Sequence, residues 1–239
     1  KGESDDEITK YLRLDDVDNL QSFIMRYQID IEEYNVPHNI FDDFSNDLNL
    51  INYSALYGSI KCFKYLLLNN SMVDFQTLYF AVYGGNIEII KIVNQKCMLF
   101  DNSNYNETQR TYFHRTIKLT ISQHKNEIFD WIINQDFFES EKNVSSLTDL
   151  VYTSAINGNA HSIIEIIDNE LNITPNLFTN IIKKASKNGF YSLAQLLMNF
   201  IAKNPKNDTT IVANFVDCNF KFSIKFGNIS ICKLFTMEM

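Results

Sequence analysis

Glycine and proline are scarce in this chain, which has seven glycines and three prolines among its 239 residues. A fold rich in β-sheet needs more turn residues at this length, so the scarcity favours helices joined by short polar loops. The sequence also lacks a run of about 18 apolar residues, the length of a membrane-spanning helix. Its first seven residues are too acidic and polar for a signal peptide, and we expect no membrane span.

A basic balance is missing as well. The 29 Asp and Glu residues outnumber the 21 Lys and Arg residues, which gives a formal net charge of −8. Proteins that bind duplex nucleic acid normally carry a basic balance or a dense basic stripe. We therefore expect no nucleic-acid partner.

The residue patterns of catalytic and metal sites are absent from the sequence. The four histidines form no metal-binding spacing such as His-Glu-x-x-His, and there is no Gly-x-Ser-x-Gly elbow and no glycine-rich phosphate loop. The acidic pairs Asp15-Asp16 and Asp42-Asp43 are better explained as helix caps and solvated loops than as an acid–base pair. We expect no enzymatic activity, no catalytic residue, no metal site and no cofactor.

The cysteines indicate a reducing environment. None of Cys62, Cys97, Cys218 and Cys232 stands in a Cys-x-x-Cys pair. This usage predicts reduced, buried thiols in an intracellular, cytoplasmic protein.

What the sequence does contain is material for a core and a recurring pattern. Hydrophobic residues make up 45% of the chain and include 19 Phe and 12 Tyr. One ordered pattern recurs, most clearly over 53–68, 80–93 and 153–167. It consists of an apolar residue, then small residues, then a glycine with a polar residue, and then a second apolar helix. Taking the glycine or its substitute as the anchor of each repeat gives Asp15, Gly58, Gly85, His124, Gly158, Gly189 and Gly227. Their spacing of roughly 27 to 43 residues centres near a period of about 33.

Other positions fall into register with these anchors. The residues seven before, five after and eight after the anchor are apolar in every repeat, and the residue four before it is small in six of seven. Positions +5 and +8 share one face of a helix, and a small residue at −4 lets two helices approach closely. The anchor glycine suits the left-handed conformation that ends a helix. The register predicts a first helix from about −9 to −2 and a second from about +2 to +9, stacked on neighbouring hairpins.

The segments 55–68 and 85–93 resemble the Gly-His/Asn-x-Glu-Ile-Val-Lys-x-Leu core of ankyrin repeats. The resemblance extends over about residues 5–239. The chain is similar in particular to the divergent ankyrin proteins of some anaerobic protists, which carry a domain of unassigned function. It implies an all-α solenoid of about seven stacked helix-turn-helix repeats, forming a single domain over residues 1–239.

The sequence departs from ordinary ankyrin repeats at the start of the first helix. The usual Thr-Pro-Leu-His is replaced by the residues 49–52, 76–79 and 218–221. Regular β-turn fingers are therefore not expected, and the loops are expected to be longer or helical, with long connections near 34–48, 99–113, 137–147 and 199–211. Pro37 and Pro205 fall in these ranges, and Pro175 is likewise assigned to a connection between helices, where a missing N–H group does least harm.

The resemblance also implies where a partner binds. Ankyrin proteins usually hold partners on a concave face, onto which the residues one and two before the anchor point. The candidate partner-binding residues are Arg13, Leu56, Tyr57, Tyr83, Gln123, Ile156, Asn157, Lys187, Lys225 and Phe226. Exposed aromatic residues flanked by charge are typical of the core and rim of an interface.

Several functions remain open on the sequence alone. The leading hypothesis is a monomeric scaffold that binds an unidentified partner protein on the concave face. One alternative is a targeting or adaptor segment of a larger multidomain protein. Another is a binder of an acidic ligand through the C-terminal lysines Lys183, Lys184, Lys187, Lys221 and Lys225.

Overall fold

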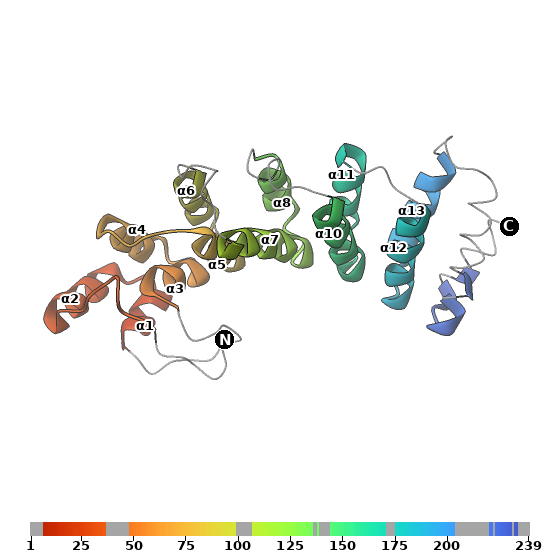
Figure 1. Ribbon diagram of the computed structural model, residues 1–239. Coiled ribbons are helices and arrows are strands. Elements are labelled where there is room, and N and C mark those ends of the chain that lie inside the picture. Colours follow the sequence, from red (N-terminus) through yellow and green to blue (C-terminus); the bar gives the residue numbers. More distant parts are fainter. Residues whose placement is uncertain are drawn as a thin grey trace. The chain divides into compact units, whose positions relative to one another are not determined.

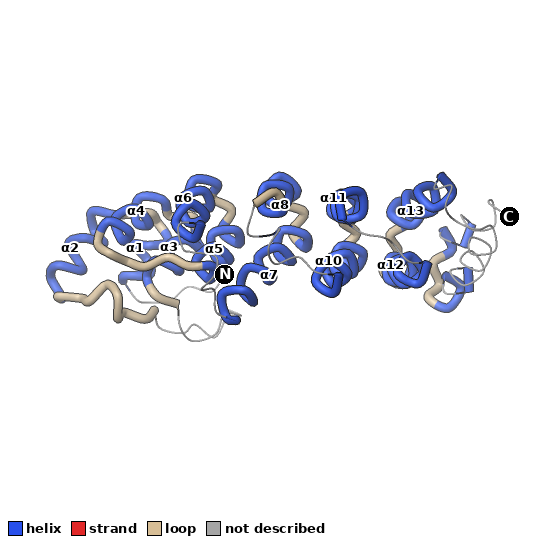
Figure 2. Tube along the Cα trace, turned by 45° about the horizontal axis from the view of Figure 1, so that its top comes forward, coloured by secondary structure: helices blue, strands red, loops and turns tan. Residues whose placement is uncertain are grey.

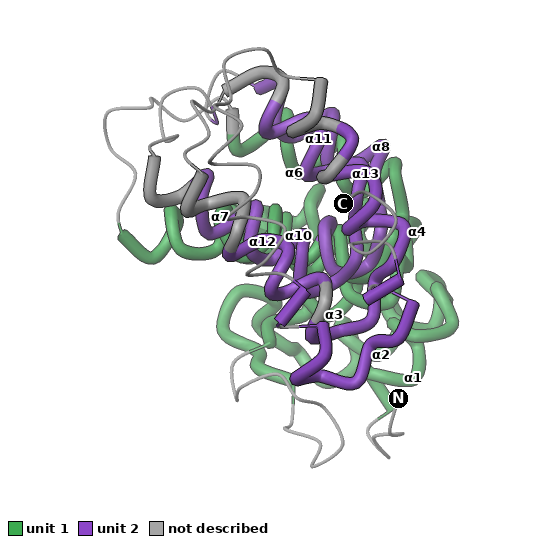
Figure 3. The backbone as a smooth tube through the Cα atoms, turned by 90° about the vertical axis from the view of Figure 1, so that its right-hand side faces the viewer, with its two compact units in different colours: residues 1–119 green, residues 120–239 purple. Residues whose placement is uncertain are grey.

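The structure is a computed structural model that describes residues 7–36, 48–98, 107–135, 138, 144–170, 175–203, 220–221, 223–230 and 232–233. Over these residues the chain forms helices and loops, with one isolated β-bridge between Asn35 and Asn49 (Figure 2). It divides into two compact units, residues 1–119 and 120–239, with the division inside helix α7, Glu107–Ser122 (Figure 3). The single domain over 1–239 stays a prediction.

The first unit is built from helical hairpins (Figure 1). Its helices are α1 (Glu7–Arg13), α2 (Val17–Tyr27), α3 (Leu50–Tyr57), α4 (Ile60–Leu68), α5 (Phe75–Gly84), α6 (Ile87–Met98) and the first part of α7. The first helices of successive hairpins, α1, α3 and α5, contact one another, and the second helices α2, α4 and α6 form their own row. The core of the unit lies between these two rows because each hairpin has an apolar face to bury.

The second unit repeats this arrangement. Its helices are α8 (Asn126–Ile133), α10 (Val144–Asn157), α11 (Ala160–Glu170), α12 (Pro175–Lys187) and α13 (Tyr191–Lys203), followed by helical residues on both sides of Gly227. The first helices α10 and α12 contact each other, as do the second helices α8 and α11.

The turn inside each hairpin follows the predicted register. All seven anchors have a positive φ, including the two that are not glycine, Asp15 and His124, each at 54°. In six of the seven repeats the N–H group after the anchor donates to the carbonyl oxygen four residues before it, as from Ser59 to Ser54 at 2.9 Å. This is the hydrogen bond of a Schellman motif, which ends a helix at a left-handed residue.

The register columns form the core. In the first six repeats, position −7 is at most 1% exposed and position +5 at most 2% exposed. The small residues at −4 from Ser54 to Ser223 are fully buried. The predicted pattern of hairpins is confirmed by this burial.

Three of the predicted connections are shorter than expected. α7 begins at Glu107, α10 begins at Val144 and α13 continues to Lys203. α7 is longer because Phe113, Ile117 and Ile121, all buried, extend its apolar face one turn back. Pro175 is the first residue of α12 rather than part of a connection, a position where a helix needs no proline N–H. Pro37 and Pro205 lie outside the described residues.

Candidate partner-binding surface

Basic residues gather on the first helices of the hairpins. These helices, with the helical residues before Gly227, carry ten Lys and Arg but three Asp and Glu, whereas the second helices and those after Gly227 carry seven of each. The protein as a whole has a net charge of −8. The excess positive charge lies on α1, α7, α12 and the helical residues before Gly227, and it favours anionic groups near these elements.

In the first unit the predicted residues occupy different depths. Leu56 is 1% exposed and belongs to the core, because the next first helix, α5, covers it. It is therefore corrected from a surface residue to a core residue. Tyr57 is half-buried, with its ring centroid 4.7 Å from that of Tyr53. Arg13 donates from Nη1 to the Tyr53 hydroxyl at 3.2 Å, so Arg13, Tyr53 and Tyr57 form one cluster on α1 and α3.

Tyr83 belongs to a second aromatic cluster that includes residues not predicted from the sequence. Its neighbour Tyr79 lies one turn earlier on α5, and the Tyr79 ring is 6.2 Å from the ring of Tyr112 on α7. The Arg115 guanidinium lies over both rings, 5.8 Å from Tyr79 and 5.6 Å from Tyr112. Partial burial raises the pKa of the Tyr79 hydroxyl, although Arg115 opposes the shift. Tyr112 was missed because 99–113 was expected to be a connection.

In the second unit most predicted residues are accessible. Gln123, Lys187 and Lys225 are exposed, Ile156 is 44% exposed and Phe226 is 38% exposed. Asn157 is half-buried, and its amide nitrogen donates to the carbonyl of Thr153 on its own helix at 2.8 Å. Its own carbonyl oxygen lies 3.1 Å from His124 Nε2 in the preceding turn. Asn157 therefore helps to join two repeats.

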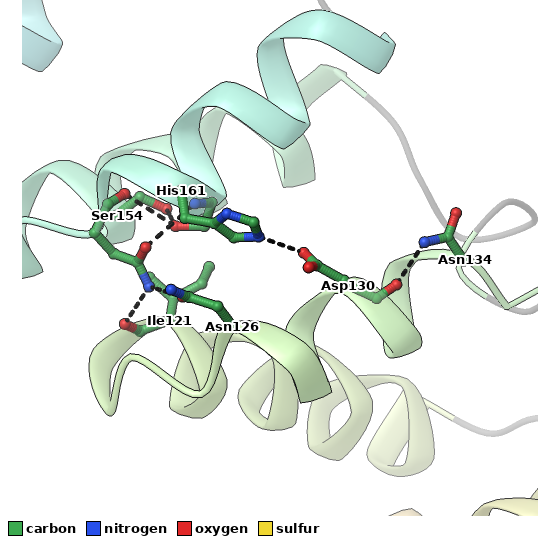
Figure 4. Close-up of polar contacts among 8 residues, drawn as sticks. Ile121, Asn126, Asp130, Asn134, Ser154 and His161 are labelled. Carbon is green, nitrogen blue, oxygen red and sulfur yellow. Dashed lines mark hydrogen bonds and ion pairs between the residues drawn. The ribbon is translucent and has the colours of Figure 1, made fainter. Parts of the chain in front are cut away.

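A buried polar network links successive repeats in the second unit (Figure 4). The Nδ2 of Asn159 donates to the Ile121 carbonyl and to Asn126 Oδ1, both at 3.0 Å. Asn159 Oδ1 accepts from the Ser162 N–H, and the Ser162 hydroxyl donates to Ser154 Oγ at 2.8 Å. The same amide therefore caps α11 and ties it to the preceding hairpin.

The described cysteines are buried or half-buried. Cys62 and Cys97 are buried, and burial raises the pKa of each thiol to about 12. Such thiols stay protonated at neutral pH and react poorly as nucleophiles. Cys232 is half-buried, and Cys218 lies outside the described residues.

The described residues contain neither a metal-binding cluster nor a membrane-spanning helix. Among them, no group of three or more His, Cys, Asp or Glu side chains is placed to hold a metal ion. No helix within the same residues is long and apolar enough to cross a membrane.

The fold is found among solved structures. The chain is similar to the crystal structure of the human ASB11 ankyrin repeat domain, with a TM-score of 0.54 over 86% of this chain and 88% of that one. The chain has the ankyrin-repeat fold. The identity in this match is 10%, and neither a protein-family model nor a curated protein matches the sequence.

The ankyrin-repeat fold forms here without the usual Thr-Pro-Leu-His start. In the second repeat Asn49 caps α3 by accepting from the Asn52 N–H at 2.9 Å. In the third, Asp74 and Thr77 form a reciprocal capping box at the start of α5. Different side chains thus supply the same helix start, which the backbone requires but a sequence comparison does not recognise.

Proposed function

We propose that this chain is a protein–protein interaction scaffold whose first helices and hairpin turns hold a partner protein on the concave face of the ankyrin-type repeats. The observation that carries the proposal is the fold, together with accessible aromatic and basic side chains on the same helices. Tyr and Arg are enriched at the energetic centres of protein interfaces, where they offer rigid contact area and several hydrogen bonds.

Tyr57 and Tyr83 are the proposed anchors in the first unit. Both are half-buried, so part of each ring is already held by the protein and loses little conformational freedom on binding. Arg13 lies beside the first anchor through Tyr53. In the second unit the apolar contacts come from Ile156 and Phe226. The polar rim consists of Gln123, Lys187 and Lys225, while Asn157 supports the turn.

The test is a pull-down from native lysate with the chain as bait, followed by identification of the partner and measurement of its affinity for the purified chain. We expect Tyr57→Ala/Tyr83→Ala to weaken binding by at least about tenfold, the scale of a hot-spot residue. The control is Tyr27→Ala/Tyr191→Ala, which removes two exposed tyrosines from second helices. Equal affinity of the two double variants, each with a helical circular dichroism spectrum, contradicts the choice of surface.

A second candidate function is binding of an acidic ligand through the C-terminal lysines. Residues 175–203, which include α12 and α13, contain no Asp or Glu, and Lys184, Lys187 and Lys225 are exposed. Vesicles that contain a phosphoinositide test this function by co-sedimentation at low and at physiological salt. Loss of binding in Lys184→Glu/Lys187→Glu supports it, and no sedimentation at either salt concentration contradicts it.

A third candidate is that the chain acts as a targeting or adaptor segment of a larger multidomain protein. A scaffold that holds one partner does this work equally well when a second domain is joined to it. The full-length transcript decides this directly, since an open reading frame that extends into another domain supports the adaptor and one that ends with this chain contradicts it.

A further inference from the structure

Four side chains of the first unit form one surface on α5 and α7: Tyr79, Tyr83, Tyr112 and Arg115. Tyr79 and Tyr83 are four residues apart and Tyr112 and Arg115 are three apart, so each pair shares one face of its helix. The Arg115 guanidinium bridges the helices by lying within 6 Å of the ring centroids of both Tyr79 and Tyr112. We call these residues the tyrosine–arginine surface.

Buried aromatic residues hold this surface in place. Phe75 and Phe113, both buried, pack edge to face on the same two helices with ring centroids 5.3 Å apart. Phe80, also buried, packs edge-on against Tyr79 at 5.5 Å. The three tyrosines are half-buried and Arg115 is exposed, so the rings are held in place while the cation remains accessible. A preorganised surface of this kind loses little entropy when a ligand binds.

The charge of the surface selects the ligand. α3 and α5 contain no charged residue, and α7 carries Arg110, Arg115 and Lys118 against one acidic residue, Glu107. The guanidinium lies within cation–π range of both rings and is exposed, and a guanidinium can bind a carboxylate in bidentate fashion through its N–H groups. An anionic group therefore fits beside Arg115.

A free anion does not use the rest of the surface. The Tyr79 and Tyr112 rings flank the cation, and Tyr83 lies one turn along α5 from Tyr79. The contact area of these rings favours a ligand that carries apolar side chains next to its negative charge. We propose that the tyrosine–arginine surface binds an acidic segment of a partner protein in which Asp or Glu alternates with apolar side chains. This proposal rests on the proposed scaffold function and specifies the chemistry of its partner.

The probe is a random peptide library displayed on phage and selected on the full chain. We expect the selected peptides to be enriched in Asp and Glu next to aromatic or aliphatic residues. Arg115→Glu, a change at an exposed helical position, should lower the affinity of a selected peptide by at least about tenfold. Arg26→Glu makes the same charge change at an exposed position of α2 and should leave that affinity unchanged.

A smaller change separates charge from stacking. Arg115→Lys keeps the positive charge but loses the planar fork of N–H donors. We therefore expect its affinity for the peptide to fall a few-fold, to a value between those of the unaltered chain and Arg115→Glu. Tyr112→Ala should also weaken the same peptide, because it removes one of the rings on which the guanidinium lies.

The outcomes are distinct. Selected peptides without acidic enrichment, or acidic peptides that bind Arg115→Glu as well as the unaltered chain, overturn the proposal. A chain that selects no peptide but sediments with phosphatidylserine vesicles overturns it in favour of a lipid surface. The scaffold function is judged separately by the lysate pull-down, so a partner held through Tyr57 and the second-unit residues leaves that function standing.

Discussion

Asn86 in the first unit and Asn159 in the second stand at the same place in their repeats, directly after the left-handed glycine. Each caps the second helix of its hairpin through Oδ1 and donates from Nδ2 to a carbonyl of the preceding repeat. The difference is burial. Asn86 is half-buried and binds the Gly58 carbonyl, whereas Asn159 is 1% exposed and joins a network with Asn126 and Ser162.

Both units join their repeats through such bonds, and in the first unit the buried Ser59 hydroxyl also donates to the Leu12 carbonyl, but the packing around the bonds differs. In the first unit the first helices approach so closely that a Cβ added at Gly84 would lie 2.3 Å from the Ala55 carbonyl oxygen and 2.8 Å from that of Leu56. In the second unit the buried Asn159 amide donates to the Ile121 carbonyl of the preceding repeat, and its oxygen accepts from the Ser162 N–H. Close packing fails when volume is added, and a buried network fails when a partner is removed.

The largest expected effect comes from breaking the buried network. Asn159→Ala removes the donor to Ile121 and Asn126 and the cap of Ser162, and it leaves these groups buried without those bonds. We expect the free energy of unfolding in urea to fall by about 3 kcal/mol. Asn159→Asp keeps the capping oxygens and serves as the control for the lost donor. Equal stability of Asn159→Ala and the unaltered chain contradicts the network.

The next effect comes from adding volume at the close contact in the first unit. Gly84→Ala should gain about 1 kcal/mol from helix propensity, but the clash with two backbone carbonyls costs about 3 kcal/mol. The expected net loss is about 2 kcal/mol in thermal or urea unfolding. Gly227→Ala is the control, because its φ of 71° is strained while nothing lies within 4 Å of an added Cβ. A more stable Gly84→Ala variant contradicts the close approach of α3 and α5.

The sequence was sufficient for features that the local backbone dictates. A left-handed residue between two helices and a 3.6-residue apolar period are local requirements, so the anchors could be placed even where Asp15 and His124 replace glycine. Their φ of 54° confirms the register. The ankyrin-type fold class followed from stacking these hairpins.

The candidate surface could be predicted in part. The register shows which side of a helix Leu56 occupies but not how far α5 covers it, and that depends on the absence of a side chain at Gly84. Tyr112 could not be predicted because the start of α7 depends on packing of Phe113 against Phe75 in another repeat, and Arg115 lies at −9, away from the positions −1 and −2 assigned to the concave face. Such non-local contacts leave no periodic signal in the sequence.

A smaller effect is expected at the equivalent asparagine of the first unit. Asn86→Ala removes the bond to the Gly58 carbonyl at 2.9 Å and the cap of Glu88 and Ile89. Water reaches this half-buried site and replaces some of the lost hydrogen bonds. We therefore expect a decrease of about 1 kcal/mol in the free energy of unfolding. If Asn86→Ala costs as much as Asn159→Ala, burial is not what distinguishes the two units.

The smallest effect concerns two polar side-chain pairs that also occupy equivalent positions. Lys64 and Glu88 lie six and three residues after their anchors and meet at 2.6 Å, and Asp130 and His161 lie at the same two positions and meet at 2.7 Å. The acidic partner stands at +3 in the first unit and at +6 in the second, so the register fixes the geometry and not which position is acidic. The Lys64 and Glu88 side chains are 50% and 58% exposed. A double-mutant cycle of Lys64→Met and Glu88→Gln should give a coupling of about 0.5 kcal/mol that vanishes at high salt. A coupling above about 1 kcal/mol would mean that this exposed pair stabilises the contact between its repeats as much as the Asn86 amide does. The contrast between the units would then rest on Gly84 and Asn159 alone.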